Sequence, residues 1–181
     1  MHLKTFLNRV TDYKSFVFEK ITWQKESLTP KLEVEVRPRT NRRPVCSGCG
    51  KLAPGYDTMP TPRRFEFVPL WGIAIVLMYT MRRVNCPRCG VRVELVPWGE
   101  GKSTLTTEYT WYLAKWARRM SWKEVSEAMG VSWDRVFEAV KRAVKWGLAR
   151  RDLDSITSIG VDEVQWHRGH KYQTVVYQID E

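Results

Sequence analysis

The chain has 181 residues, of which 43% are hydrophobic and nine are tryptophan. This composition favours one ordinary domain, or two or three small ones, and excludes a disordered tail. The net charge of +10 and the pI of 9.6 indicate a polyanionic partner, either nucleic acid or an anionic membrane surface.

Membrane and secretion signals are not evident in the sequence. The first ten residues lack the apolar core of a signal peptide. The longest apolar run, residues 68–79, contains a proline and a glycine and is far shorter than the roughly 20 residues of a membrane helix. We therefore expect a cytoplasmic protein without a membrane partner.

Charge is unevenly distributed along the chain. Residues 37–92 hold eleven Lys and Arg against two acids, and residues 113–151 hold ten against four. The last thirty residues hold six acids against two bases. Two basic segments followed by an acidic one are typical of a DNA-binding protein that leads into a further domain.

Residues 1–36 are predicted to form a helix followed by a strand. Apolar residues between Phe6 and Val17 fall at roughly helical spacing, which predicts one continuous helix there. Apolar and charged residues then alternate from Lys31 to Val36, as they do in a strand with one buried face.

All four cysteines lie in residues 37–98, which we predict to form a zinc-ribbon-like β module. They make two Cys-x-x-Cys-Gly units about 36 residues apart, formed by Cys46, Cys49, Cys86 and Cys89. This spacing suits a structural Zn²⁺ site of four thiolates, which contributes on the order of 10 kcal/mol to folding. Two disulfides or four free thiols are the alternatives, and a cytosolic location disfavours disulfides.

Four arginines of the same module flank its predicted strands, where they are candidates for contact with DNA phosphates. They are Arg63, Arg64, Arg82 and Arg83. Solvated surface arginines are the alternative. Residues 99–104, which are rich in glycine and polar residues, are predicted to be a linker.

Residues 105–147 are predicted to form three helices. The second begins at Ser121 with the spacing of a capping box and ends at Gly130, whose backbone permits a tight turn. Val131 is expected to anchor the turn in the core, and Ser132 to cap the third helix. This layout is that of a helix-turn-helix, in which the second of the two helices enters the major groove.

The outer face of the third helix supplies the remaining candidate DNA contacts: Trp133, Arg135, Lys141, Arg142 and Lys145. The N-terminal residues of that helix would approach base edges, and the later basic residues would bind phosphates. An ordinary three-helix bundle with a solvated basic face is the alternative.

A second predicted linker, residues 148–158, leads to a β-hairpin over residues 159–181. Its two strands are Ile159–Asp162 and Tyr172–Ile179. The expected protein is therefore an α+β chain of several modules.

Taken in order, these motifs resemble the N-terminal two-thirds of a bacterial insertion-sequence transposase of the ISL-three family. The resemblance rests on the cysteine module with the Arg82–Cys86 approach, on the Met120–Val125 stretch of the helix-turn-helix, and on residues 159–164 and 171–176 of the hairpin. The ordered succession of these motifs is more specific than any one of them.

The resemblance implies that the hairpin begins a ribonuclease-H-like catalytic domain of the DDE type. In that family three carboxylates hold two divalent ions, Mg²⁺ or Mn²⁺, for attack on a phosphodiester. Asp162 matches the first carboxylate, whereas Glu163 points to the other face of the strand and is a weaker candidate. A surface strand carboxylate is the alternative for Asp162. Asp180 and Glu181 do not match the family pattern.

Because the chain stops after the second strand, we expect a truncated transposase that binds double-stranded DNA at the terminal inverted repeats of its element. Such a chain would sit at the bacterial or archaeal nucleoid, is compatible with a homo-oligomer, and would not cut DNA unaided. Two alternatives remain open. One is a stand-alone DNA-binding regulator that competes with full-length transposase, and the other is a zinc-ribbon module that docks on protein.

Overall fold

The structure is a computed structural model, and it describes four ranges of the chain: residues 2–11, 13–24, 30–154 and 156–179. The chain divides within its last helix into two compact units, Met1–Ala143 and Val144–Glu181. No helix within the described ranges is long and apolar enough to span a membrane.

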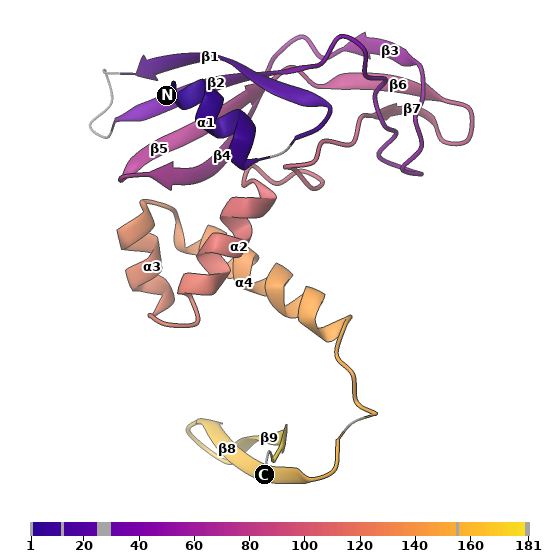
Figure 1. Cartoon of the computed structure of the whole chain (residues 1–181). Helices are drawn as coiled ribbons and strands as arrows, with labels where there is room; N and C mark the ends of the chain where they lie inside the picture. The colour runs from indigo at the N-terminus through magenta and orange to yellow at the C-terminus, as the bar shows by residue number, and fades with distance from the viewer. Residues whose placement is uncertain (1, 12, 25–29, 155, 180–181) are drawn as a thin grey trace. The chain divides into compact units, whose positions relative to one another are not determined.

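A four-stranded sheet forms the main body of the first unit (Figure 1). Its strands, in spatial order, are β1 (Phe16–Gln24), β2 (Lys31–Pro38), β5 (Ile73–Tyr79) and β4 (Arg63–Leu70). The β2–β5 pair is parallel and the other two pairs are antiparallel. The alternation predicted for β2 is confirmed, because Leu32, Val34 and Val36 are all buried.

The N-terminal helix α1 (Leu3–Val10) is shorter than predicted, and Phe16–Val17 belong to strand β1 instead. The side chain of Asn8 accepts a hydrogen bond from the main-chain N–H of Phe18 at 3.1 Å and donates one to its carbonyl at 3.3 Å. These bonds hold the helix against the strand that follows it. The prediction of one continuous helix was wrong because aromatic residues at positions 16 and 18 pack equally well from a strand, where alternate side chains share a face.

Trp98 lies at the centre of the core of this sheet and is fully buried. Its ring is surrounded by aromatic rings at centroid distances of 4.8 to 6.1 Å, from Tyr13, Phe16, Phe65 and Tyr79. Edge-on packing of this kind stabilises a core beyond the area it buries. The segment that follows the second cysteine pair is therefore part of the same core as the N-terminal strand.

A smaller sheet carries the second cysteine pair. Its strands, in spatial order, are β3 (Gly55–Thr58), β6 (Arg82–Cys86) and β7 (Gly90–Val93), all antiparallel. Strand pairing therefore divides residues 37–98 between two sheets, since β4 and β5 belong to the larger one.

Three helices follow: α2 (Thr107–Trp116), α3 (Trp122–Met129) and α4 (Trp133–Leu148). They share a core formed by Leu105, Tyr109, Leu113, Val125, Val131, Val136 and Ala139. Helix α2 begins after Thr106, whose side chain caps it by accepting the N–H of Tyr109, and it ends at Trp116. Trp111 of this helix is exposed.

The predicted capping box and Gly130 turn between α3 and α4 are present, whereas Ser132, the predicted cap of α4, makes no side-chain hydrogen bond within the described residues. Ser121 and Glu124 form a reciprocal capping box at the start of α3. Gly130 ends the helix in the left-handed conformation, with φ 62° and ψ 32°. Val131 is buried, and its carbonyl accepts a hydrogen bond from Ser126 at 2.6 Å. The sequence therefore places α3 and α4 as two helices joined by a short, fixed turn.

The second unit contains the last turn of α4 and a two-stranded antiparallel sheet of β8 (Ile159–His167) and β9 (Lys171–Gln178). The hairpin was predicted, although β8 is longer than expected. Large apolar side chains such as Val161, Trp166 and Tyr177 are exposed on it.

Candidate metal centre and nucleic-acid interface

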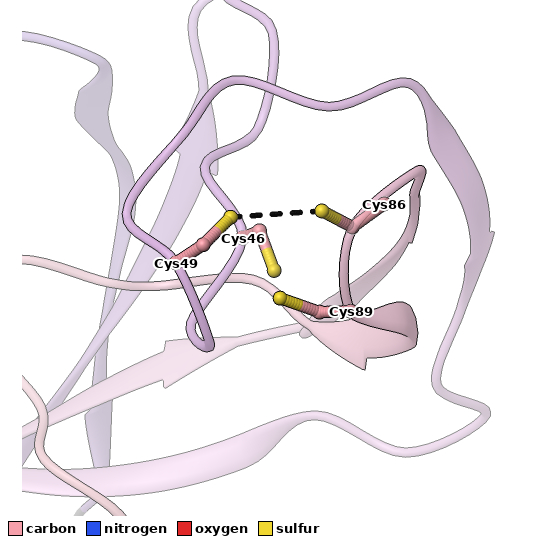
Figure 2. A group of neighbouring side chains, drawn as sticks. All are labelled: Cys46, Cys49, Cys86 and Cys89. Carbon is pink, nitrogen blue, oxygen red and sulfur yellow. Dashed lines mark hydrogen bonds between the residues drawn. The ribbon is translucent and has the colours of Figure 1, made fainter.

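The four cysteines converge from two loops of the first unit, and their sulfurs face one another (Figure 2). All four Sγ atoms lie within 4.8 Å of one another, and Cys49 Sγ is 3.6 Å from Cys86 Sγ. A tetrahedral ion with Zn–S bonds of about 2.3 Å sets its sulfurs about 3.8 Å apart. All four cysteines are free thiols in the structure. The arrangement therefore suits one metal ion and does not suit two disulfides.

Glycines shape both cysteine loops. Gly50 and Gly90, which follow the second cysteine of each pair, have φ of 67° and 70°. Gly50 donates its N–H to the carbonyl of Cys46 at 2.9 Å, which closes the first loop. Gly48 donates its N–H to Cys46 Sγ at 3.4 Å, and a Cβ at Gly48 would lie 3.1 Å from Cys89 Sγ. The loops therefore need small residues where the sulfurs meet.

The thiols influence one another strongly. Hydrogen bonds from the backbone at Arg88 and Cys89 lower the pKa of Cys86 to about 7. The pKa of Cys89 shifts in the opposite direction, because hydrogen bonding to Cys49 and then burial raise it to about 12. The Cys86 thiol therefore loses its proton readily, whereas loss of the Cys89 proton is disfavoured. A bound cation would lower the pKa of the remaining thiols and favour the thiolate form of all four. Four neighbouring thiols of this kind could hold a metal ion.

A buried ion pair lies at the base of the second cysteine loop. The side chain of Glu94 is fully buried, and Arg82 binds it through Nε at 2.9 Å and Nη2 at 2.6 Å. The hydroxyl of Tyr79 also donates to Glu94. Burial, and then the hydrogen bond and charge of Glu94, raise the pKa of Tyr79 above its usual value. Arg82, a predicted phosphate ligand, is only 18% exposed and is directed into the protein.

The other three arginines predicted to contact DNA from this module also have partners within the protein. Arg63 donates to the carbonyls of Gly101 at 2.9 Å and Ser103 at 2.8 Å, so it holds the segment predicted to be a linker. Arg64 pairs with Glu33 at 2.8 Å.

Arg83 forms a bidentate pair with Asp57 on the small sheet, and both side chains are about 40% exposed. The hydrogen bond from Arg83 holds the pKa of the Asp57 carboxyl below its usual value. The guanidinium also lies 5.4 Å from the ring of Tyr56. Of the four arginines, Arg83 is therefore partly exposed, but its guanidinium already binds the carboxylate of Asp57.

Two of the predicted contacts on α4 bind other elements of the same unit. Arg135 pairs with Glu66 of β4, which fastens the start of α4 to the large sheet. Arg142 lies 3.7 Å from the carboxylate of Glu100. Both interactions join residues far apart in the sequence, so sequence periodicity alone gave no sign of them.

The exposed start of α4 carries an aromatic cluster. Trp133 is 49% exposed and Phe137 is 38% exposed, and their rings stack at 5.7 Å with an interplanar angle of 9°. Trp122 of α3 packs against Trp133 at 5.4 Å. Lys141 is exposed one turn further along, and Lys145 is exposed in the last turn of the helix. Sequence reasoning missed Phe137, although it stands four residues after Trp133 and so on the same face.

Asp162 lies in β8 of the second unit, opposite Val175 of β9. It is exposed, and its Oδ1 accepts the N–H of Glu163 at 2.8 Å. Within the described ranges the cysteines are the group of side chains brought together for a metal, and Asp162 is not part of it. Asp180 and Glu181 lie outside the described residues.

Comparison with known proteins finds no family model that matches the chain and no solved structure that matches it. The chain is 30% identical over 172 residues to the transposase for insertion sequence element IS1557 of Mycobacterium tuberculosis, covering 92% of this chain and 38% of that protein. It is 24% identical over 166 residues to the transposase for insertion sequence element IS1001 of Bordetella parapertussis, covering 91% and 40%.

The chain therefore spans about two fifths of the length of these curated relatives, less than the two-thirds expected from the motifs. Its homologues are named insertion-sequence transposases, and the likeness to them extends over nine tenths of its own length.

Proposed function

We propose that this chain is the DNA-recognition part of an insertion-sequence transposase of the ISL-three family, and that it binds the terminal inverted repeats of its element. The observation that supports this most strongly is the likeness to two transposases over more than 90% of the chain. The net charge of +10 and the α3–turn–α4 geometry are in keeping with a duplex DNA partner.

In this proposal α4 is the recognition helix and lies in the major groove. The exposed stack of Trp133 and Phe137 would contact thymine methyl groups, since apolar side chains read that group. Lys141 and Lys145, which lie four residues apart on one face of the helix, would bind phosphates at one edge of the groove. Arg135, whose side chain is held by Glu66, would fix the angle of the helix on the sheet rather than read a base.

The cysteine centre would hold a structural Zn²⁺ through Cys46, Cys49, Cys86 and Cys89. Such an ion would join the two loops through four thiolate ligands and would have a structural rather than a catalytic role. Its contribution is stability on the order of 10 kcal/mol, which a small three-stranded sheet needs.

Asp162 is proposed as the first carboxylate of a DDE-type, ribonuclease-H-like site for Mg²⁺ or Mn²⁺. A single carboxylate does not hold two divalent ions, and within the described residues Asp162 belongs to no group of three or more potential metal-binding side chains. We therefore assign no step of phosphodiester transfer to the described residues. A cytoplasmic, nucleoid-associated location follows from a DNA partner.

The proposal is tested by measuring the dissociation constant of the zinc-loaded chain for a labelled duplex between 50 and 200 mM KCl. A protein that makes about six phosphate contacts loses affinity on the order of 10³-fold over this range. Weak or salt-independent binding would instead indicate a module that docks on protein. Asp162→Asn serves as the control, because its affinity for DNA should equal that of the unaltered chain.

A further inference from the structure

Six of the residues predicted to contact DNA are arginines that the fold already uses: Arg63, Arg64, Arg82, Arg83, Arg135 and Arg142. A cation that is held by a carboxylate gains less from a phosphate, because the existing pair has to be broken or shared. The large positive charge of the chain must therefore act through other residues.

The turn from Arg39 to Arg43 carries three arginines that the fold does not use in this way. The side chains of Arg39, Arg42 and Arg43 are exposed, and within the described ranges none of them has a hydrogen bond or an ion pair. Residues 36–56 contain five cationic residues and no acidic one. The positive field of this turn is therefore not neutralised by its surroundings.

The backbone of the turn is fixed at both ends. Arg39 donates its N–H to the carbonyl of Ser15 at 2.9 Å, and Arg42 donates to the carbonyl of Arg39 at 3.1 Å. The carbonyl of Pro44 accepts the N–H of Ala53 at 3.1 Å, two residues before Cys46 begins the metal centre. Because strand β2 ends on one side and the cysteine loop begins on the other, the backbone that carries the arginines is held in place before any partner binds.

Residues 39–42 of the turn also line a cavity of about 310 Å³ that is open to solvent, together with Val17 and Arg37. No carboxylate lines it, and Arg37 is itself paired with Glu19 at 2.7 Å. Thr40 and Asn41 contribute small polar side chains of the kind that donate to phosphate oxygens. Guanidinium groups around such a hollow suit a phosphate, which they can bind through two parallel hydrogen bonds.

We infer that the Arg39–Arg43 turn is a second DNA contact, which binds the phosphate backbone of the duplex at a distance from the helix-turn-helix. The inference rests on the proposed function, since it assumes a duplex partner. It assigns to this turn the role that sequence reasoning gave to the arginines of β4 and β6. A duplex fits better than a lipid surface, because the turn exposes no apolar side chain that could enter a membrane.

The test uses the full zinc-loaded chain with Arg39→Gln, Arg42→Gln and Arg43→Gln combined. Each phosphate contact adds about 0.9 to the slope of log affinity against log salt, so the slope should fall by about 2.7. Affinity at 100 mM KCl should fall on the order of 10² to 10³-fold. The same three positions changed to Lys keep the charge and should restore most of the slope.

A charge-matched control replaces Lys4, Arg9 and Lys20, which are also exposed, by Gln. Its salt slope should stay within about 0.5 of the slope of the unaltered chain. Equal zinc content and equal melting temperature of all variants exclude misfolding as the cause.

Three results would overturn the inference. If the unaltered chain binds duplex DNA and the arginine variant keeps its slope, the turn makes no contact, while the proposed function stands. An equal loss in the control variant shows a general charge effect. If the unaltered chain binds vesicles containing phosphatidylserine but not duplex DNA, both the contact and the proposed function are wrong.

Discussion

Replacing Arg82 by Met should destabilise the first unit strongly, because it leaves the carboxylate of Glu94 buried without its cation. The side chain of Glu94 is fully buried and that of Arg82 is 18% exposed, so little water can replace the lost bonds. Two donors remain, the hydroxyl of Tyr79 and the main-chain N–H of Arg82 at 2.9 Å.

Removing one partner of a buried pair costs roughly 3–5 kcal/mol, and the two remaining donors place this case near 3 kcal/mol. The neighbouring Arg83→Met is the matched control. Its pair with Asp57 is about 40% exposed on both sides, so its loss should cost less than about 1 kcal/mol. Changing Glu94 to Gln in the Arg82→Met background removes the unpaired charge and should recover part of the stability.

The assay is urea unfolding of the zinc-loaded protein, followed by far-ultraviolet circular dichroism and tryptophan fluorescence. With an m value of about 2 kcal/mol per M, a loss of 3 kcal/mol lowers the midpoint by about 1.5 M. Equal midpoints for Arg82→Met and Arg83→Met would refute the reasoning. They would show that the bond to Glu94 contributes no more than an exposed pair, and would return Arg82 to the candidate DNA contacts.

Four further outcomes are expected. Trp71 occupies a hairpin turn at φ 52°, so Trp71→Asn should raise stability by about 1 kcal/mol in urea unfolding. Gly130→Ala places a side chain at φ 62° and should lower stability by about 1 kcal/mol. Cys86→Ser should reduce bound zinc, measured by atomic absorption, from one ion per chain to none. Hydrogen bonds with the side chain and backbone of Ser121 lower the pKa of Glu124, so its stabilising effect is complete above the unfolded-state pKa of about 4.3 and is lost as the pH falls through the lower folded value. The melting-temperature difference between the unaltered chain and Glu124→Ala should accordingly shrink below about pH 4, and a difference that grows there would contradict this.

Features set by a few neighbouring residues could be predicted from the sequence. The capping box at Ser121, the left-handed Gly130 and the two cysteine loops each depend on contacts within about five residues. The spacing of a few neighbouring residues therefore determines their geometry, and the structure has the predicted geometry. The convergence of Cys46 and Cys86 is not a local feature, since forty positions separate them, and it was predicted because four thiolates in two such loops suit one tetrahedral metal ion.

Features that depend on distant partners could not be predicted. The parallel pairing of β2 with β5 joins residues about forty positions apart, such as Val34 and Leu77. An arginine looks like a surface cation until its carboxylate partner is known, and the partner of Arg135 in α4 is Glu66, 69 positions away. For that reason the sequence identified the basic segments but did not show which arginines bind groups within the protein and which do not.

The most direct test of the account is sequence preference. The zinc-loaded chain should be titrated, at 150 mM KCl, with duplexes cut from the DNA that flanks its coding region and with shuffled duplexes of the same composition. Specific sites are bound at least about 10³-fold more tightly than random duplex, and we expect one flanking duplex to reach this ratio. Equal affinity for flanking and shuffled duplexes would contradict the claim that the chain recognises the ends of its element.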